Sequence, residues 1–102
     1  MEALKDKTVI VTGAAGGIGR AVAEEAGHAG ARLALVDADA ARLGETAAAI
    51  RAAGAEVLPC VVDMTDRAAW QKCIDDIAAH FGGIDVLVNN AIWVKYEPMA
   101  EV

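Results

Sequence analysis

A glycine-rich stretch that follows a short apolar run constrains the fold more than any other part of the sequence. The run Val9-Ile10-Val11 leads into Thr12-Gly13-Ala14-Ala15-Gly16-Gly17-Ile18-Gly19, where helical spacing of apolar residues begins. Gly13, Gly17 and Gly19 have no Cβ, so the backbone can turn sharply and a ligand can approach closely. Because the start of a helix carries free N–H groups and partial positive charge, this turn suits a diphosphate.

Polar residues end the three later apolar runs. Asp37 ends the second run, at about the distance from Gly19 expected of a carboxylate that binds adenosine ribose hydroxyls. Asp63 ends the third run, and Asn89-Asn90-Ala91 ends the fourth. A lone glycine cluster also marks ordinary turns, but these residues would meet it at one edge of a parallel sheet. The combination predicts dinucleotide binding.

Apolar runs alternate with amphipathic segments along the whole chain. The strands predicted from the apolar runs cover residues 7–12, 31–36, 55–62 and 84–88. Glycines close the helices between them, at positions 30, 54, 82 and 83. Short connections between strands and helices predict an α/β fold, a Rossmann-type doubly wound parallel sheet with strand order 3-2-1-4 within this chain.

Side-chain patterns give further expectations for each element. The first helix has an apolar stripe expected to face the sheet, made of Ile18, Val22, Ala26 and Ala29. The third has a stripe expected in the core, made of Trp70, Cys73, Ile74, Ile77 and Phe81. Asp39 is placed to cap the second helix, and either Thr65 or Asp66 the third. Pro59 favours a sheet edge for the third strand.

Composition excludes several classes of function. The net charge is −6 with no basic run, which argues against nucleic acid as a partner. No apolar run approaches the roughly 18 residues of a membrane span, and the first residues lack the features of a signal peptide. Cys60 and Cys73 form no Cys-x-x-Cys pair, and His28 and His80 are scattered, so we expect reduced, packed thiols, no metal site and a cytoplasmic protein.

The motifs together resemble the short-chain dehydrogenase/reductase family. They are Thr-Gly-x-x-x-Gly-x-Gly, the acidic Asp37 after the second strand, Asp63 in Val-Asp-Met-Thr, and Asn-Asn-Ala after the fourth strand. The resemblance runs through residues 1–102 but covers only the NAD-binding first half of that family's single domain. On this reading the part of the domain that carries catalysis is absent.

The resemblance implies a role for each motif. Residues of the glycine-rich stretch would wrap the pyrophosphate and the adenosine ribose: Gly13, Ala15, Gly16, Gly17, Ile18 and Gly19. Asp37 would accept hydrogen bonds from both ribose hydroxyls, Asp63 and the Met64 backbone would hold the adenine, and Asn90-Ala91 would line the ribose crevice. An alternative for Asp63 is a helix-start acid. The family usually has glycine where this chain has Ile92. A side chain at this position would narrow the approach to the nicotinamide side of the cofactor site.

The same resemblance implies NAD as the cofactor. Asp37 would repel the 2′-phosphate of NADP, and the positions where NADP-binding relatives usually place a cation hold Gly16 and Ala38. Arg42, a turn into the next helix, is the one cation that could reach back.

Catalysis in the resembled family uses a serine and Tyr-x-x-x-Lys. This sequence has no serine, and its only tyrosine, Tyr96, is followed four residues later by Ala100. No catalytic residue is therefore assigned, and the chain alone is expected to be inactive. The resemblance implies that the full-length protein transfers hydride between nicotinamide and an alcohol or carbonyl substrate, and that it forms homo-oligomers.

Two other classes of function remain. One is a non-catalytic module that binds NAD or pairs with another chain. The other is an S-adenosylmethionine methyltransferase, which shares the sheet and the acid after the second strand. The Thr-Gly start, the Gly17-x-Gly19 spacing and Asn89-Asn90-Ala91 disfavour the methyltransferase.

Overall fold

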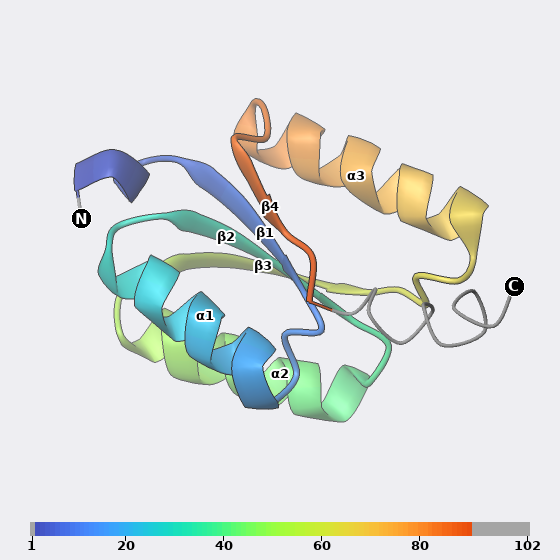
Figure 1. Cartoon of the computed structure of the whole chain (residues 1–102), viewed down its shortest axis with the longest axis horizontal. Coiled ribbons are helices and arrows are strands. Elements are labelled where there is room, and N and C mark those ends of the chain that lie inside the picture. The colour runs from blue at the N-terminus through green and yellow to red at the C-terminus, as the bar shows by residue number, and fades with distance from the viewer. Residues whose placement is uncertain (1, 91–102) are drawn as a thin grey trace, which may run out of the picture.

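A four-stranded parallel sheet forms the middle layer of the molecule (Figure 1). The computed structural model describes residues 2–90. The elements are the 3-10 helix η1 (Glu2–Leu4), the strands β1 (Thr8–Thr12), β2 (Arg32–Asp37), β3 (Glu56–Val61) and β4 (Val86–Val88), and the helices α1 (Gly17–His28), α2 (Ala40–Ala52) and α3 (Arg67–Phe81). The strand order β3-β2-β1-β4, with every pair parallel, confirms the predicted fold class.

Helices cover both faces of the sheet. α1 and α2 lie on one face, and α3 lies on the other (Figure 1). β1 is buried along its whole length, and its side chains alternate between the two cores. Val9 and Val11 join the cluster under α1 and α2, whereas Ile10 joins the cluster under α3. This arrangement places the end of β1, and the glycine-rich loop after it, at the middle of the sheet.

The helix ends follow the predicted capping. Asp39 precedes α2, and its Oδ1 accepts a hydrogen bond from the N–H of Arg42 at 3.1 Å. Of the two candidates for the third helix, Asp66 is the cap, because its Oδ1 accepts from the N–H of Ala69 at 3.0 Å. Gly82 closes α3 with a φ of 86°, in the left-handed region that glycine adopts most readily.

The edge position of the third strand is also confirmed. β3 lies at one end of the sheet, where Pro59 stands opposite Leu35 of β2. Because an edge strand leaves half of its N–H groups outside the ladder, a proline there removes a donor that the sheet does not need. In the cluster under α3, Phe81 is buried as predicted, and Trp70 is half-buried.

The expectation for the buried face of α1 was partly wrong. The buried residues of the helix are Gly19, Ala23 and Ala26, whereas Ile18 is 73% exposed. Small residues face the sheet because the glycine-rich loop brings the start of α1 close to β1, which leaves no room there for a large side chain. The helix therefore turns its bulkier residues, Ile18 and Val22, toward the side of β4.

The fourth strand is shorter than predicted. It begins at Val86 rather than at residue 84. The Asp85 carboxylate explains the difference, because its Oδ2 accepts a hydrogen bond from the N–H of Thr8 at 2.8 Å. This side-chain oxygen takes the place of the backbone acceptor that would extend the ladder between β4 and β1.

Within residues 2–90, no helix is long and apolar enough to cross a membrane.

Candidate nucleotide-binding site

The glycine-rich loop joins β1 to α1 at the carboxyl edge of the sheet. Gly13 and Gly17 have φ angles of 65° and 59°, which a side chain would make unfavourable. Gly16, with an extended backbone, is the residue before the first turn of α1. Since the first N–H groups of a helix have no acceptor within the helix, the loop presents donors and partial positive charge at this edge. Such a turn can bind a diphosphate.

Gly19 allows the helix to start close to the strand. A Cβ at position 19 would overlap the carbonyl oxygen of Gly13 and would lie 3.0 Å from Nδ2 of Asn90. The missing side chain therefore permits two close contacts, one within the loop and one with the segment after β4. Together they place Asn90 beside the start of α1, as the sequence predicts for the crevice between strands 1 and 4.

Three hydrogen bonds hold the loop in position. The N–H of Ala14 donates to the carbonyl oxygen of Val36 at 3.2 Å, and the N–H of Ala15 donates to Oδ2 of Asp37 at 3.0 Å. The hydroxyl of Thr46, on α2, donates to the carbonyl oxygen of Ala15 at 3.2 Å. The loop is thus fixed from β2 and from α2 before any ligand binds.

Thr46 is a site residue that sequence reasoning missed. It is fully buried and lies on the face of α2 that also carries Leu43 and Ile50. The available signal was a single hydroxyl on an otherwise apolar helical face, because a buried hydroxyl requires a hydrogen-bond partner. The identity of that partner, a loop carbonyl 31 residues away, depends on the tertiary structure.

Asp37 lies at the end of β2, directly beside the loop. Its second oxygen, Oδ1, accepts a hydrogen bond from the N–H of Asp39 at 3.0 Å. Each carboxylate oxygen has two acceptor positions, so both oxygens can still accept from a further donor. Asp37 also lines a cavity of about 190 Å³ at this edge, together with Gly13, Ala38, Val62, Asp63, Met64 and Thr65. The structure therefore brings together three of the predicted site motifs.

Asp63 and Met64 follow β3 on the far side of this cavity. Oδ1 of Asp63 accepts from the N–H and from the hydroxyl of Thr65, at 2.9 Å and 2.7 Å. Asp63 therefore shapes the turn before α3, which is close to its predicted alternative as an acid at a helix start. Met64 is half-buried and packs against the cluster under α3. Both residues still line the cavity that Asp37 lines.

The segment after β4 is tied to the end of β1. The N–H of Asn90 donates to Oγ1 of Thr12 at 2.8 Å, and the Thr12 hydroxyl lies 3.1 Å from Oδ1 of Asn89. Asn89 and Asn90 of the predicted motif therefore flank the glycine-rich loop. Ala91 itself lies outside the described residues, as do Ile92 and Tyr96.

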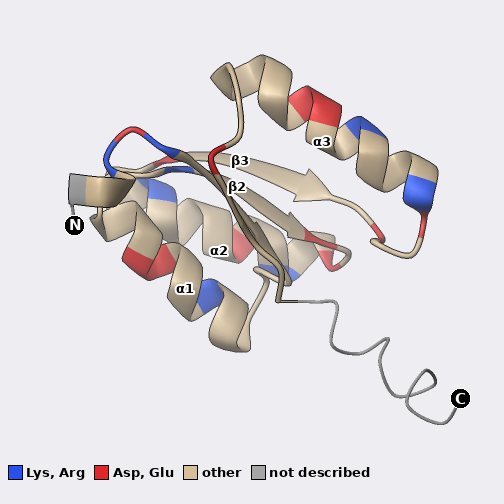
Figure 2. Cartoon of the chain, turned by 45° about the horizontal axis from the view of Figure 1, so that its top comes forward, with Lys and Arg blue, Asp and Glu red and all other residues tan. Residues whose placement is uncertain are grey.

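Acidic residues surround the carboxyl edge of the sheet. Figure 2 shows acidic residues at the end of β2 and in the segments that follow β2 and β3. In the sequence these are Asp37, Asp39, Asp63 and Asp66. An edge of this charge favours a ligand that offers hydroxyl and amide donors, and it disfavours additional phosphate groups. The N-terminus of α1 supplies positive potential for the diphosphate.

Comparison with known proteins agrees with this geometry. The model of the short chain dehydrogenase family matches residues 7–102. Short chain dehydrogenase/reductase dpchG of Colletotrichum higginsianum is 39% identical over 100 residues, which cover 97% of this chain and 37% of that protein. The chain spans between 37% and 58% of the length of the first curated relatives that it matches.

Solved structures give the same result. A short chain dehydrogenase/reductase from Burkholderia phymatum, in complex with NAD, has a TM-score of 0.81 and 37% identity over 85% of this chain and 31% of its own. A metagenomic short-chain oxidoreductase, in complex with NADP, has a TM-score of 0.83 and 37% identity over 87% of this chain and 40% of its own. The chain belongs to the short-chain dehydrogenase/reductase family of oxidoreductases.

Proposed function

We propose that this region binds NAD and forms the cofactor-binding part of a dehydrogenase or reductase. The reaction would be hydride transfer between the nicotinamide ring and a small alcohol or carbonyl substrate. The observation that carries the proposal is the position of Asp37, whose carboxylate ends β2 and bonds to the glycine-rich loop. A carboxylate so placed accepts hydrogen bonds from both hydroxyls of an adenosine ribose.

Each part of the site has a place in this proposal. The loop from Gly13 to Gly19 would hold the pyrophosphate through its N–H groups, and Asp37 would hold the adenosine ribose. The adenine would enter the cavity of about 190 Å³ beside Asp63 and Met64. Asn90 and Ala91 would line the crevice toward the second ribose.

The preference for NAD over NADP rests on charge. The 2′-phosphate of NADP would lie close to the Asp37 carboxylate, and the two negative charges would repel each other. Gly16 and Ala38, which flank the same place, carry no charge. The relatives in complex with NAD and with NADP have the same fold, so the choice depends on side chains such as these.

The experiment is a change of cofactor preference in the intact protein that contains this segment. We expect wild type to have a higher kcat/KM with NAD than with NADP. Asp37→Ala combined with Ala38→Arg should shift the ratio toward NADP by about tenfold or more, because a repulsion is removed and a phosphate ligand is added. Ala48→Arg, which adds the same charge at an exposed position of α2, is the matched control. A wild-type enzyme that prefers NADP would contradict the role of Asp37.

A non-catalytic NAD-binding module is the second candidate. It differs from the enzyme in having no serine and no Tyr-x-x-x-Lys motif, the catalytic residues of the resembled family. The coding sequence after Val102 separates the two candidates: a serine and a Tyr-x-x-x-Lys motif support the enzyme, and a stop codon supports the module.

For the full-length protein we propose a cytoplasmic location and assembly into homo-oligomers.

A further inference from the structure

The guanidinium group of Arg42 lies against the glycine-rich loop. A Cβ at Gly16 would be 2.7 Å from Nη2 and 3.4 Å from Cζ of Arg42. The cation therefore occupies the space in which a side chain at position 16 would begin. Although Arg42 belongs to α2, its charge stands at the turn between β1 and α1.

The geometry of α2 explains this position. Arg42 and Thr46 are four residues apart, so they lie on the same face of the helix. Thr46 donates its hydroxyl to the carbonyl oxygen of Ala15, and Arg42, one turn nearer the start of the helix, contacts the next residue, Gly16. The Asp39 cap fixes the backbone N–H of Arg42 and with it the first turn.

Arg42 forms no ion pair with a carboxylate in the part of the chain that the structure describes. The ion pairs among residues 2–90 are Arg20 with Glu24 and Lys72 with Asp76, and neither includes Arg42. The side chain of Arg42 is exposed and lies beside Gly16. The residue before Gly16, Ala15, donates a backbone hydrogen bond to Asp37. An exposed guanidinium thus stands one residue along the loop from the Asp37 contact.

We propose that Arg42 is a second determinant of cofactor specificity, acting in the opposite sense to Asp37. The inference rests on the proposed binding of a nicotinamide dinucleotide with its adenosine ribose at Asp37. The 2′-phosphate of NADP would then lie between the carboxylate that repels it and a guanidinium that can donate two parallel hydrogen bonds to it. NAD has at that position only the 2′-hydroxyl, which Asp37 would bind, and no phosphate for Arg42. The site accordingly accepts NADP as a weaker cofactor instead of excluding it.

The test compares the dissociation constants of NAD and NADP for the intact protein and for Arg42→Gln. We expect the affinity for NADP to fall by about tenfold, because a charged hydrogen bond to phosphate is lost, and the affinity for NAD to change by less than about twofold. Arg42→Lys, which keeps the charge without the planar fork, should retain an intermediate affinity for NADP. Lys72→Gln removes an exposed charge from α3, away from the loop, and should change neither affinity.

Salt concentration supplies a second readout. The affinity of wild type for NADP should fall more steeply with added salt than its affinity for NAD, and Arg42→Gln should remove that difference. Equal weakening of NAD and NADP in Arg42→Gln would overturn the inference, because Arg42 would then act on the shared diphosphate or on the loop. Unchanged NADP binding would overturn it as well. Failure of wild type to bind NAD would instead contradict the proposed function.

Discussion

The backbone N–H of Ala15 donates a hydrogen bond to the Asp37 carboxylate at 3.0 Å, which joins the glycine-rich loop to the end of β2. The second carboxylate oxygen accepts from the N–H of Asp39, so one side chain shapes two turns. Asp37 therefore has a structural role in the free protein in addition to the proposed role toward ribose. The two roles can be separated because they predict different measurements.

Asp37→Asn should lower the free energy of unfolding by about 1 kcal/mol, since an amide has one acceptor oxygen where the carboxylate has two. Urea denaturation measures this change. Asp75→Asn is the matched control, because Asp75 is exposed and, among residues 2–90, its carboxylate accepts a hydrogen bond only from the side chain of Gln71. Equal stabilities of Asp37→Asn and wild type would show that the loop does not depend on the carboxylate.

Two glycine substitutions should have opposite effects. Gly19→Ala should destabilise the fold by about 2 kcal/mol or more, because the new methyl group overlaps the backbone of Gly13. Gly44→Ala, in the exposed middle of α2 with nothing within 4 Å, should stabilise it by about 0.5–1 kcal/mol. The substitution is the same at both sites, so thermal or urea unfolding of the two variants separates the effect of the close approach at Gly19 from the effect of helix propensity. A stabilised Gly19→Ala would contradict the loop geometry.

The two cysteines should be slow to react in the folded protein. Both are free thiols, Cys73 buried in α3 and Cys60 half-buried in β3. Burial raises the pKa of the Cys60 thiol to about 12, with smaller contributions from the neighbouring Cys73 and Asp76, and burial also raises the pKa of Cys73. Since the thiolate is the reactive form, iodoacetamide at about pH 8.5 should label the unfolded chain much faster than the folded chain.

The same shift gives a pH dependence of stability. The folded-state pKa of Cys60 lies above the ordinary value of 9.0 that applies in the unfolded chain. The unfolded chain therefore loses its proton first, and stability should fall as the pH rises from about 9 toward 12. Cys60→Ala should reduce the fall in stability between about pH 9 and pH 12, because it removes the Cys60 thiol. Rapid labelling of folded Cys60 at neutral pH would contradict the protonated state of this half-buried thiol.

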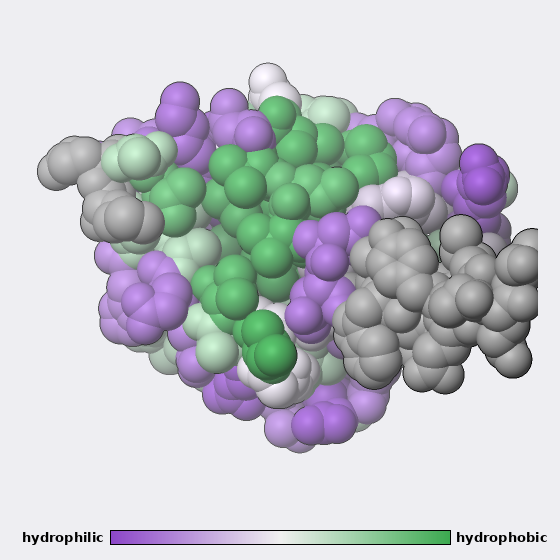
Figure 3. All heavy atoms as spheres, in the orientation of Figure 1, coloured by the Kyte–Doolittle hydropathy of each residue, from purple (hydrophilic) through white to green (hydrophobic). Residues whose placement is uncertain are grey.

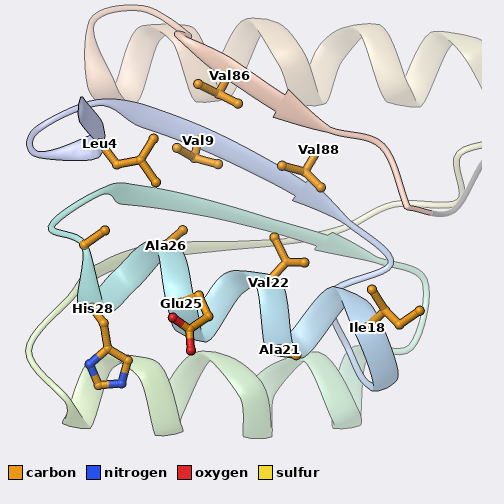
Figure 4. Close-up of a pocket in the computed structure, with 11 residues that line it drawn as sticks. Leu4, Val9, Ile18, Ala21, Val22, Glu25, Ala26, His28, Val86 and Val88 are labelled. Carbon is orange, nitrogen blue, oxygen red and sulfur yellow. The ribbon is translucent and has the colours of Figure 1, made fainter. Parts of the chain in front are cut away.

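An apolar groove between α1 and β4 should cause the 102-residue chain to self-associate. Figure 3 shows apolar surface over β4 and α1, and Figure 4 shows Ile18, Val22, Val86 and Val88 pointing into a groove of about 530 Å³. Among residues 2–90, β4 is the last strand of the sheet, so no described strand pairs with the outer side of its backbone. Light scattering at tens of micromolar, about the range in which such edges aggregate, should show oligomers.

Val86→Lys should reduce this association, because a charge on an edge strand opposes pairing with a second chain. Val86 is 37% exposed, so a lysine there can extend to solvent. Ala48→Lys adds the same charge to the exposed side of α2 and should leave the association unchanged. A monomeric wild-type chain under these conditions would count against the edge as an association site.

Periodicity and turn chemistry were sufficient to predict the order of the elements. The glycine-rich turn and the polar strand ends predicted the sheet order and the meeting of Asp37 with the loop, because parallel strands end at one edge. The face of α1 was predicted wrongly at Ile18, since hydrophobic spacing does not report how closely a helix approaches a strand. The contacts of Thr46 and Arg42 with the loop join distant segments through side chains, and local pattern does not specify such pairs.

On the proposed function, the glycine-rich loop and Asp37 form a binding site for NAD. Isothermal titration of the intact protein with NAD tests it most directly. We expect saturable binding with one NAD per chain, weakened by about tenfold in Asp37→Ala, because hydrogen bonds between the ribose hydroxyls and the carboxylate are lost. Titration of the control Asp75→Asn should match wild type. Binding that does not saturate, or that is equally strong in Asp37→Ala, would contradict the account.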